Sequence, residues 1–307
     1  MTVHGTVVSL RAGDYAAQVG QVGATLLSLT HRGHHLIDPV PPDRVDDAWR
    51  GRTLVPWPNR VAGGSYTVDH TTYELPVNEP ETGAALHGLA AFQRWDLADS
   101  TAHSARWTLD LPATPGYPFQ VRCTTSYALD AEGGLSVSVE GTTTGPVAAP
   151  FGASTHPYLT CDRRLLDECA ITLPAAAVLH TDGRGTPTDL VPVAGTELDL
   201  SGPAALRGRS VDHAFTDLPA AWSVELTHPT APGVRLDSDA PWVQLYTGER
   251  IGRQAAAVEP MTCPPDAFNR TPEEVLLTPG ASRSVSLLIS ALPPAAAVTP
   301  PGAGRGR

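Results

Sequence analysis

The stretch Leu135-Ser-Val-Ser-Val-Glu140 alternates apolar and polar residues from end to end. Successive side chains of a β-strand point to opposite faces, so a period of two buries one face and leaves the other in solvent. The same alternation recurs in three other runs, namely Trp107–Leu111, Ser223–Leu226 and Ser284–Ile289. The sequence therefore predicts a chain built mainly from β-strands.

Turn-forming residues separate these runs. Three examples are Ala62–Ser65, Asp130–Gly134 and Ala231–Gly233, and they favour hairpins over helical crossovers. The chain also holds 28 Gly and 30 Pro, which leaves few places for a long helix. The best helical candidate, Arg163–Cys169, is only one or two turns long. We expect an all-β protein, a large antiparallel β-sandwich with few short helices.

No shift in composition and no low-complexity linker divides the chain before residue 290. We therefore expect one domain over residues 1–292. The remaining residues, 293–307, are mostly Pro, Gly and Ala, and they offer too little apolar surface to offset the entropy of ordering them. They are predicted to form a disordered tail.

The charge balance limits the possible partners. The formal net charge is -11, and binding to nucleic acid or to an anionic membrane relies instead on clustered basic residues. All 21 basic residues are arginine, which excludes enzymes that need a lysine for a Schiff base or for a phosphate-binding loop. The expected partner is a small molecule, and the sequence leaves the oligomeric state open between monomer and homodimer.

The four cysteines form no C-x-x-C pair, and the chain is far larger than the secreted scaffolds that need disulfides. The N-terminus lacks the basic and apolar regions of a signal peptide, and no stretch of roughly 18 apolar residues follows. We expect reduced cysteines and a soluble, cytoplasmic protein.

Two histidines stand beside residues that favour exposure to a ligand. His87 precedes Gly88, which lets another chain or a ligand approach closely. His156 precedes Pro157, which pushes it toward extended geometry, so its imidazole should project from a strand or strand end. A histidine titrates near neutrality and can donate or accept a proton. Either residue is also compatible with a purely structural role.

Two charged residues complete the set of candidates. Arg60 follows Pro56-Trp-Pro-Asn59, a restricted backbone that would present a fixed fork of donors. Glu259 lies in a run of small apolar residues, where burial would raise its pKa toward the range of a general base. A surface arginine and an outward-facing glutamate remain the alternatives.

The order of these residues resembles the aldose 1-epimerase, or galactose mutarotase, family over about residues 52–280. The resemblance is carried by six motifs: Asn59-Arg60 with Gly64-x-Tyr66, Leu86-His-Gly88, Thr155-His156-x-Tyr158, Val211-Asp212-x-x-Phe215, Gln244-Leu-Tyr-Thr-Gly248, and Val258-Glu-Pro260 with Pro265-Asp-x-x-Asn269. Each motif is common alone, but the ordered set is specific.

The resemblance implies a large twisted β-sandwich that interconverts the α and β anomers of a free aldose, with no metal and no cofactor. It implies that Glu259 is the general base at the anomeric hydroxyl and that His156 is the acid at the ring oxygen. The residues expected to bind the sugar are Arg60, His87, Asp212, Asn59, Trp242 and Gln244. Trp57 or Trp242 is expected to cover an apolar sugar face.

The sequence also departs from the typical galactose enzymes, because Leu89 replaces a second glycine and Pro157 follows the second histidine. These departures resemble a divergent bacterial branch that includes sulfoquinovose mutarotase-like proteins. A sulfonated sugar would need a further arginine in the pocket, for which the candidates are Arg32, Arg52 and Arg253.

Three other hypotheses stay open. The first is a carbohydrate-binding protein without turnover. The second is a glycosidase that pairs Glu259 with Asp212 or Asp266. The third is a metal site made of His34, His35 and a carboxylate, which is disfavoured because adjacent residues of a strand point to opposite faces.

Overall fold

The computed structural model describes residues 2–45 and 47–295. It confirms the predicted all-β architecture. Every strand pairing among these residues is antiparallel. Helix is limited to the single turns α1 (Ala267–Arg270) and α2 (Pro272–Val275), with 3₁₀ turns at Ala62–Gly64, Leu166–Glu168 and Glu249–Ile251. Of the expected tail, residues 296–307 lie outside the described part of the chain.

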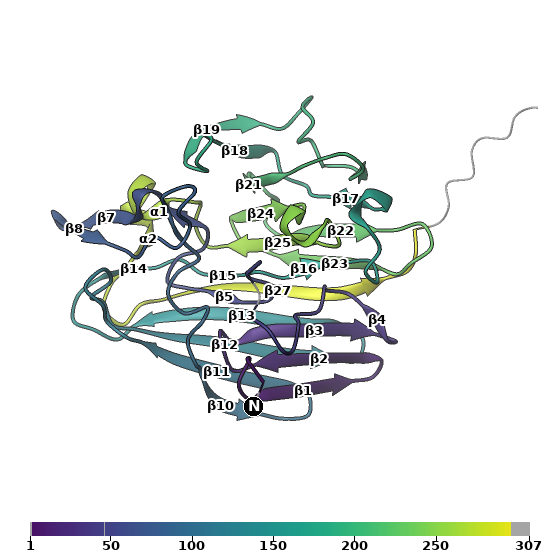
Figure 1. Cartoon of the computed structure of the whole chain (residues 1–307), viewed down its shortest axis with the longest axis horizontal. Coiled ribbons are helices and arrows are strands. Elements are labelled where there is room, and N and C mark those ends of the chain that lie inside the picture. Colours follow the sequence, from purple (N-terminus) through teal and green to yellow (C-terminus); the bar gives the residue numbers. More distant parts are fainter. Residues whose placement is uncertain (1, 46, 296–307) are drawn as a thin grey trace, which may run out of the picture.

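A nine-stranded sheet forms the base of the sandwich, and Figure 1 shows several of its strands running across the lower half of the molecule. In order across the sheet its strands are β10 (Asp96–Ser100), β11 (Ser104–Leu111), β12 (Val121–Asp130), β13 (Gly134–Thr143), β27 (Ser282–Leu292), β23 (Gly233–Ser238), β22 (Trp222–Thr227), β17 (Ala170–Thr172) and β20 (Ala204–Ala205).

All four alternating runs of the sequence lie in this sheet, in β11, β13, β22 and β27. In β13 the apolar residues Leu135, Val137 and Val139 are buried, while Ser136 is exposed. The turns Asp130–Gly134 and Ala231–Gly233 join hairpins, as predicted. Ala62–Ser65 does not, because it connects strands that pair with other partners.

A second, eight-stranded sheet carries Asp212, Gln244 and Glu259. Its path is β19 (Pro187–Pro192), β18 (Ala177–Thr181), β21 (Asp212–Thr216), β24 (Trp242–Tyr246), β25 (Ala256–Met261), β15 (Ser154–Thr155) and β5 (Thr53–Leu54), and β16 (Tyr158–Leu159) also pairs with β25. Figure 1 shows β19, β18, β21, β24 and β25 stacked in the upper half of the molecule, and β25 contacts β27 of the base sheet.

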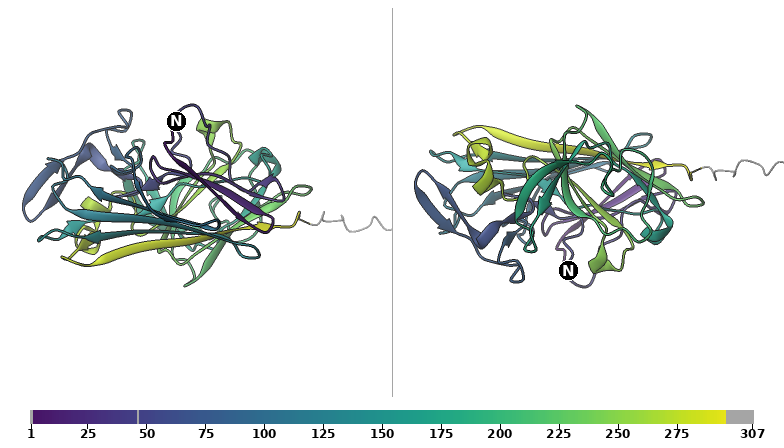
Figure 2. Two further views of the ribbon diagram at one scale, coloured as in Figure 1. Left: turned by 90° about the horizontal axis from the view of Figure 1, so that it is seen from below. Right: turned by 90° about the horizontal axis from the view of Figure 1, so that it is seen from above.

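Smaller sheets complete the fold. They are β1 (Val7–Ala12), β2 (Tyr15–Gly20), β3 (Thr25–His31) and β4 (His34–His35); β6 (Arg60–Val61) with β9 (Ala85–Leu86); β7 (Ser65–Val68) with β8 (Thr71–Glu74); and β14 (Ala149–Pro150) with β26 (Leu276–Leu277). The views of Figure 2 show the layers on edge, and β1 and β2 contact β12.

The hydrophobic core joins these layers. One cluster of buried side chains extends from Leu10 in β1 to Ile289 in β27 and includes Trp95, Trp107 and Phe151. All four cysteines are buried free thiols. Within the described residues, no helix is long and apolar enough to span a membrane. The predicted helix at Arg163–Cys169 is wrong except for the 3₁₀ turn Leu166–Glu168, since the chain around this turn is extended.

Candidate active site

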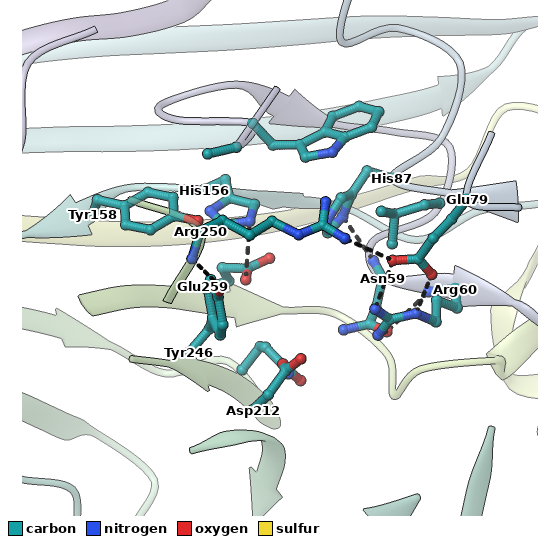
Figure 3. Close-up of a pocket in the computed structure, with 14 residues that line it drawn as sticks. Asn59, Arg60, Glu79, His87, His156, Tyr158, Asp212, Tyr246, Arg250 and Glu259 are labelled. Carbon is teal, nitrogen blue, oxygen red and sulfur yellow. Dashed lines mark hydrogen bonds and ion pairs between the residues drawn. The ribbon is translucent and has the colours of Figure 1, made fainter. Parts of the chain in front are cut away.

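A cavity of about 100 Å³ opens at one side of the eight-stranded sheet, and seven of the eight site residues predicted from the sequence line it. They are Asn59, Arg60, His87, His156, Asp212, Gln244 and Glu259. Figure 3 shows how residues from distant parts of the chain point into this space. Strand pairing brings Asp212, Gln244 and Glu259 together, because they lie in β21, β24 and β25 and β24 is the middle strand of the three.

Glu259 is held in the middle of β25, where every residue is buried. Its backbone neighbour across the strands is Gln244, and its side chain is only 2% exposed. Burial raises the pKa of Glu259 well above its ordinary value, the negative charge of Asp212 raises it further, and the positive charge of Arg60 lowers it in part. The carboxylate is therefore a stronger base than an exposed glutamate.

His156 lies between β15 and β16, at the point where Pro157 interrupts the extended chain. Its backbone is fixed on both sides, since its N–H donates to Arg52 and its carbonyl accepts from Gly51. Its Nε2 atom lies 3.4 Å from Oε1 of Glu259, and both side chains are almost fully buried. The imidazole stacks on the Tyr158 ring with centroids 5.0 Å apart. An imidazole and a carboxylate thus face the same space.

His87 adopts a left-handed backbone with φ of 61°, directly before Gly88. A Cβ atom on Gly88 would lie 2.1 Å from the carbonyl oxygen of Val55, so only glycine permits this close approach. The backbone N–H of Asn59 donates to Nδ1 of His87 over 3.2 Å. Burial, with the nearby His156, Arg60 and Arg250, holds the pKa of His87 well below its ordinary range. His87 is therefore neutral and carries its proton on Nε2.

This tautomer also bears on metal binding. Ligand atoms of His87, His156 and Glu259 lie within 4.8 Å of one another, a set that resembles zinc ligands. Because Nδ1 of His87 is occupied by the Asn59 N–H, its Nε2 is a donor and offers no lone pair to a cation. The chemistry of this set fits hydrogen bonding to an oxygen-rich ligand better than it fits a metal ion.

Arg60 is fixed by a carboxylate that the sequence did not single out. Glu79 accepts two hydrogen bonds from Arg60, from Nε over 2.6 Å and from Nη2 over 2.9 Å, and a third from the hydroxyl of Thr82 over 2.6 Å. Burial would raise the pKa of Glu79, but the bonds from Arg60 and Thr82 lower it. A largely buried arginine requires such a counter-charge, yet the sequence offers 32 acidic residues and no local signal to choose among them.

Asp212 and Gln244 form the opposite wall. Asp212 begins β21 and accepts a hydrogen bond from Nε2 of Gln244 over 2.6 Å. Asp212 is exposed, whereas Gln244 is 4% exposed. The carboxylate of Asp212 therefore borders both the cavity and solvent, in a position to accept hydrogen bonds from a ligand.

Trp242 is a correction, because it does not line the cavity. It lies on the same face of β24 as Gln244 but two residues earlier in the strand, opposite Met261. That step is about 7 Å, and it places the indole against Leu179, Ala214 and Met261. Trp57 is also excluded, since it is 2% exposed in the core and its indole N–H donates to Ala85.

The aromatic residues that line the cavity are instead Trp49, Tyr158 and Tyr246. Trp49 belongs to an irregular loop, and its ring lies 4.9 Å from that of His87 and 5.0 Å from that of Phe92. No periodic pattern surrounds Trp49 in the sequence, so only the folded chain identifies it.

None of the three arginines proposed for a charged sugar lines the cavity. Arg32 pairs with Asp14 at the surface, Arg52 is buried and donates to the carbonyl of Ala91, and Arg253 pairs with Asp167 and Glu249. Arg250 of the Glu249–Ile251 turn lines it instead. Its guanidinium lies 3.0 Å from Glu81 and 3.9 Å from Glu79.

Two of the alternative hypotheses also lose support, namely a glycosidase that pairs Glu259 with Asp266 and a metal site at His34 and His35. Asp266 lies outside the cavity lining, and its Oδ1 atom accepts hydrogen bonds from the Ala62 N–H and the Asn269 amide. His34 contacts Asp162 through Nδ1 at the surface, and neither His34 nor His35 lines the cavity.

Comparisons with known proteins identify the family and the fold. The family model for aldose 1-epimerase matches residues 6–290. The chain is 42% identical over 281 residues to the uncharacterized protein YihR of Escherichia coli K12, covering 91% of each chain. It is 29% identical over 213 residues to galactose mutarotase of Rattus norvegicus, covering 62% of this chain and 59% of that protein.

A solved structure shares the fold. The GalM/aldose epimerase homologue from C. elegans superposes with a TM-score of 0.82 at 18% identity, over 94% of this chain and 99% of that one. The match of the family model along almost the whole chain and the similarity to YihR together establish membership. The chain belongs to the aldose 1-epimerase family.

Proposed function

We propose that the protein is a mutarotase, which interconverts the α and β anomers of a free aldose. The observation that carries this proposal is the buried pair of Glu259 and His156, with 3.4 Å between their facing atoms in one cavity. Family membership supports the same reaction type. Mutarotation needs one group that takes a proton and one that gives a proton, and this pair supplies both.

The reaction starts with a closed pyranose whose anomeric hydroxyl faces Glu259. The carboxylate takes the proton of O1 while His156, in its protonated form, gives a proton to the ring oxygen. The bond between C1 and the ring oxygen breaks, and C1 becomes an aldehyde. Rotation about C1–C2 presents the other face of the aldehyde, and closure returns one proton to His156 and one from Glu259 to O1. Both groups end in their starting states.

The remaining cavity residues bind the sugar in this proposal. Neutral His87 presents an Nε2–H donor, Arg60 presents the part of its guanidinium that Glu79 does not occupy, and Asp212 accepts from hydroxyls. Trp49 offers an aromatic face for the C–H groups of the ring. Such a mixture of polar and aromatic groups suits a neutral polyol.

A charged sugar is a second candidate, favoured by Arg250. Its side chain is 52% exposed and pairs with Glu81, which is 60% exposed. Exposed pairs of this kind contribute little, roughly 0–1 kcal/mol, so an anionic sugar substituent can displace Glu81. Arg60 is a poorer partner for an anionic substituent, because its Nε and Nη2 donors already bind the buried Glu79.

The test follows the optical rotation, or the anomeric proton signals, of freshly dissolved aldoses with and without the protein. The panel includes glucose, galactose and a sulfonated hexose, and calorimetry measures binding of each sugar in parallel. Faster equilibration than the spontaneous rate supports the mutarotase. Binding without faster equilibration favours the carbohydrate-binding alternative, and release of the aglycone from aryl glycosides favours the glycosidase.

A further inference from the structure

A row of planar side chains borders the candidate active site. Ring centroids lie 5.0 Å apart between Phe92 and Trp49, 4.9 Å between Trp49 and His87, 5.2 Å between His87 and His156, and 5.0 Å between His156 and Tyr158. Four of these five side chains line the cavity, and Figure 3 shows His87, His156 and Tyr158 among them. Phe92 does not line the cavity, so it can act on a bound ligand only through Trp49.

Phe92 is held in place although it is 48% exposed. The central carbon of the Arg52 guanidinium lies 4.3 Å from the centroid of the phenyl ring, which is the geometry of a cation–π contact. Arg52 is itself buried, and it donates to the carbonyl of Ala91 over 2.7 Å. On the other side of Phe92, the carbonyl of Gln93 accepts from the N–H of Gly23. The backbone around Phe92 is therefore fixed, and its ring packs on a fixed support.

Trp49 benefits from such a neighbour, because its backbone has an unusual conformation. Its φ is 61°, in the left-handed region that bulky residues rarely adopt because it costs free energy. The carbonyl of Trp49 accepts a hydrogen bond from the N–H of Arg52 over 3.1 Å. Arg52 thus fixes the turn that carries Trp49 and also, through its guanidinium, the phenyl ring that packs beside the indole.

We propose that Phe92 is a positioning residue, which holds the Trp49 indole against the bound sugar and so increases the affinity for it. This inference rests on the proposed function. A side chain that stays half exposed gains only part of the free energy of burial, so hydrophobic packing alone is a weak reason for a phenylalanine at this position. An indole that is already fixed loses less conformational freedom when a sugar binds.

The expected effect of Phe92 is on binding and not on proton transfer. In the proposed function, Trp49 covers C–H groups of the sugar, and this contact is the same in the ground state and in the transition state. An interaction of this kind changes KM and leaves kcat unchanged. A substitution that only disturbed the fold around His156 would instead lower kcat.

The experiment measures KM, kcat and the calorimetric Kd for glucose and galactose with the wild type, Phe92→Ala and Phe92→Tyr. Phe92→Ala is expected to raise KM and Kd about three- to tenfold and to leave kcat within about twofold of the wild type. Phe92→Tyr keeps the ring and is expected to keep the wild-type values. Leu165→Ala is the matched control and should also keep them, because Leu165 is 50% exposed and does not line the cavity.

A double-mutant cycle with Trp49→Ala separates positioning from a purely structural role. If Phe92 acts through Trp49, Phe92→Ala changes Kd by less than about twofold once Trp49 is alanine. Independent, additive effects of the two substitutions overturn the proposal. An unchanged Kd in a Phe92→Ala protein that urea denaturation shows to be folded overturns it as well, and so does a fall in kcat at constant Kd.

Calorimetry keeps this test distinct from the test of the proposed function. If the wild type binds a sugar without accelerating anomer exchange, the mutarotase proposal fails, while the ratios of Kd still decide the role of Phe92. If the wild type binds no sugar of the panel, both proposals are overturned.

Discussion

Replacing Glu259 by glutamine is expected to slow catalysis strongly and, at the same time, to stabilise the fold at neutral and alkaline pH. Glu259 is 2% exposed, and its Oε2 atom has no hydrogen-bond partner among the described residues. Its pKa is raised by burial first and by Asp212 second. The ionised form therefore costs folding free energy, whereas glutamine keeps nearly the same shape without the charge.

The size of the effect depends on pH in a defined direction. Both states bind the proton below the unfolded pKa, so the contribution of Glu259 to stability is fully present there. It is lost as pH rises through the higher, folded pKa, by about 1.4 kcal/mol for each unit by which the pKa is raised. The difference in free energy of unfolding between Glu259→Gln and wild type should therefore grow from about pH 4.5 upward and then level off.

The assay is urea denaturation at several values between about pH 4 and pH 9, beside polarimetric mutarotation corrected for the spontaneous rate. Turnover should fall by about 10²–10⁴-fold, because glutamine cannot accept a proton. Glu140→Gln, at an exposed position of β13, is the control and should change neither quantity. A Glu259→Gln protein that is less stable at every pH refutes the electrostatic reasoning, and full activity refutes the assignment of the base.

Three further changes test the surroundings of this base. Asp212→Asn removes a charge that raises the pKa of Glu259, so the acid limb of the profile of kcat/KM against pH should move to lower pH; a move to higher pH would contradict the assignment. Glu79→Gln leaves Arg60 with a neutral partner and should lower the free energy of unfolding by up to about 3 kcal/mol and raise KM, as denaturation and kinetics can measure. His156→Asn should reduce turnover by at least about 10²-fold while calorimetry finds sugar affinity changed by less than about threefold.

The sequence by itself determined the strands and the family. Alternation is a local property with a period of two residues, so runs such as Leu135–Glu140 identify strands without knowledge of their partners. The ordered motifs around His156 and Glu259 pointed to the family that the comparisons then established. These signals can be read from the sequence alone because each depends on residue type and on residues nearby in the chain.

Only the tertiary structure decided which further residues complete the cavity and which predicted residue lies outside it. Trp242 is an aromatic residue on the same face of β24 as Gln244, but it lies two residues away along the strand and therefore outside the cavity. Glu79 and Trp49 line the cavity from loops and Arg250 from a single 3₁₀ turn, and such segments are too short for a period to predict the direction of a side chain. Their placement depends on how separate loops pack against the sheet, and that is set by contacts between residues far apart in the chain.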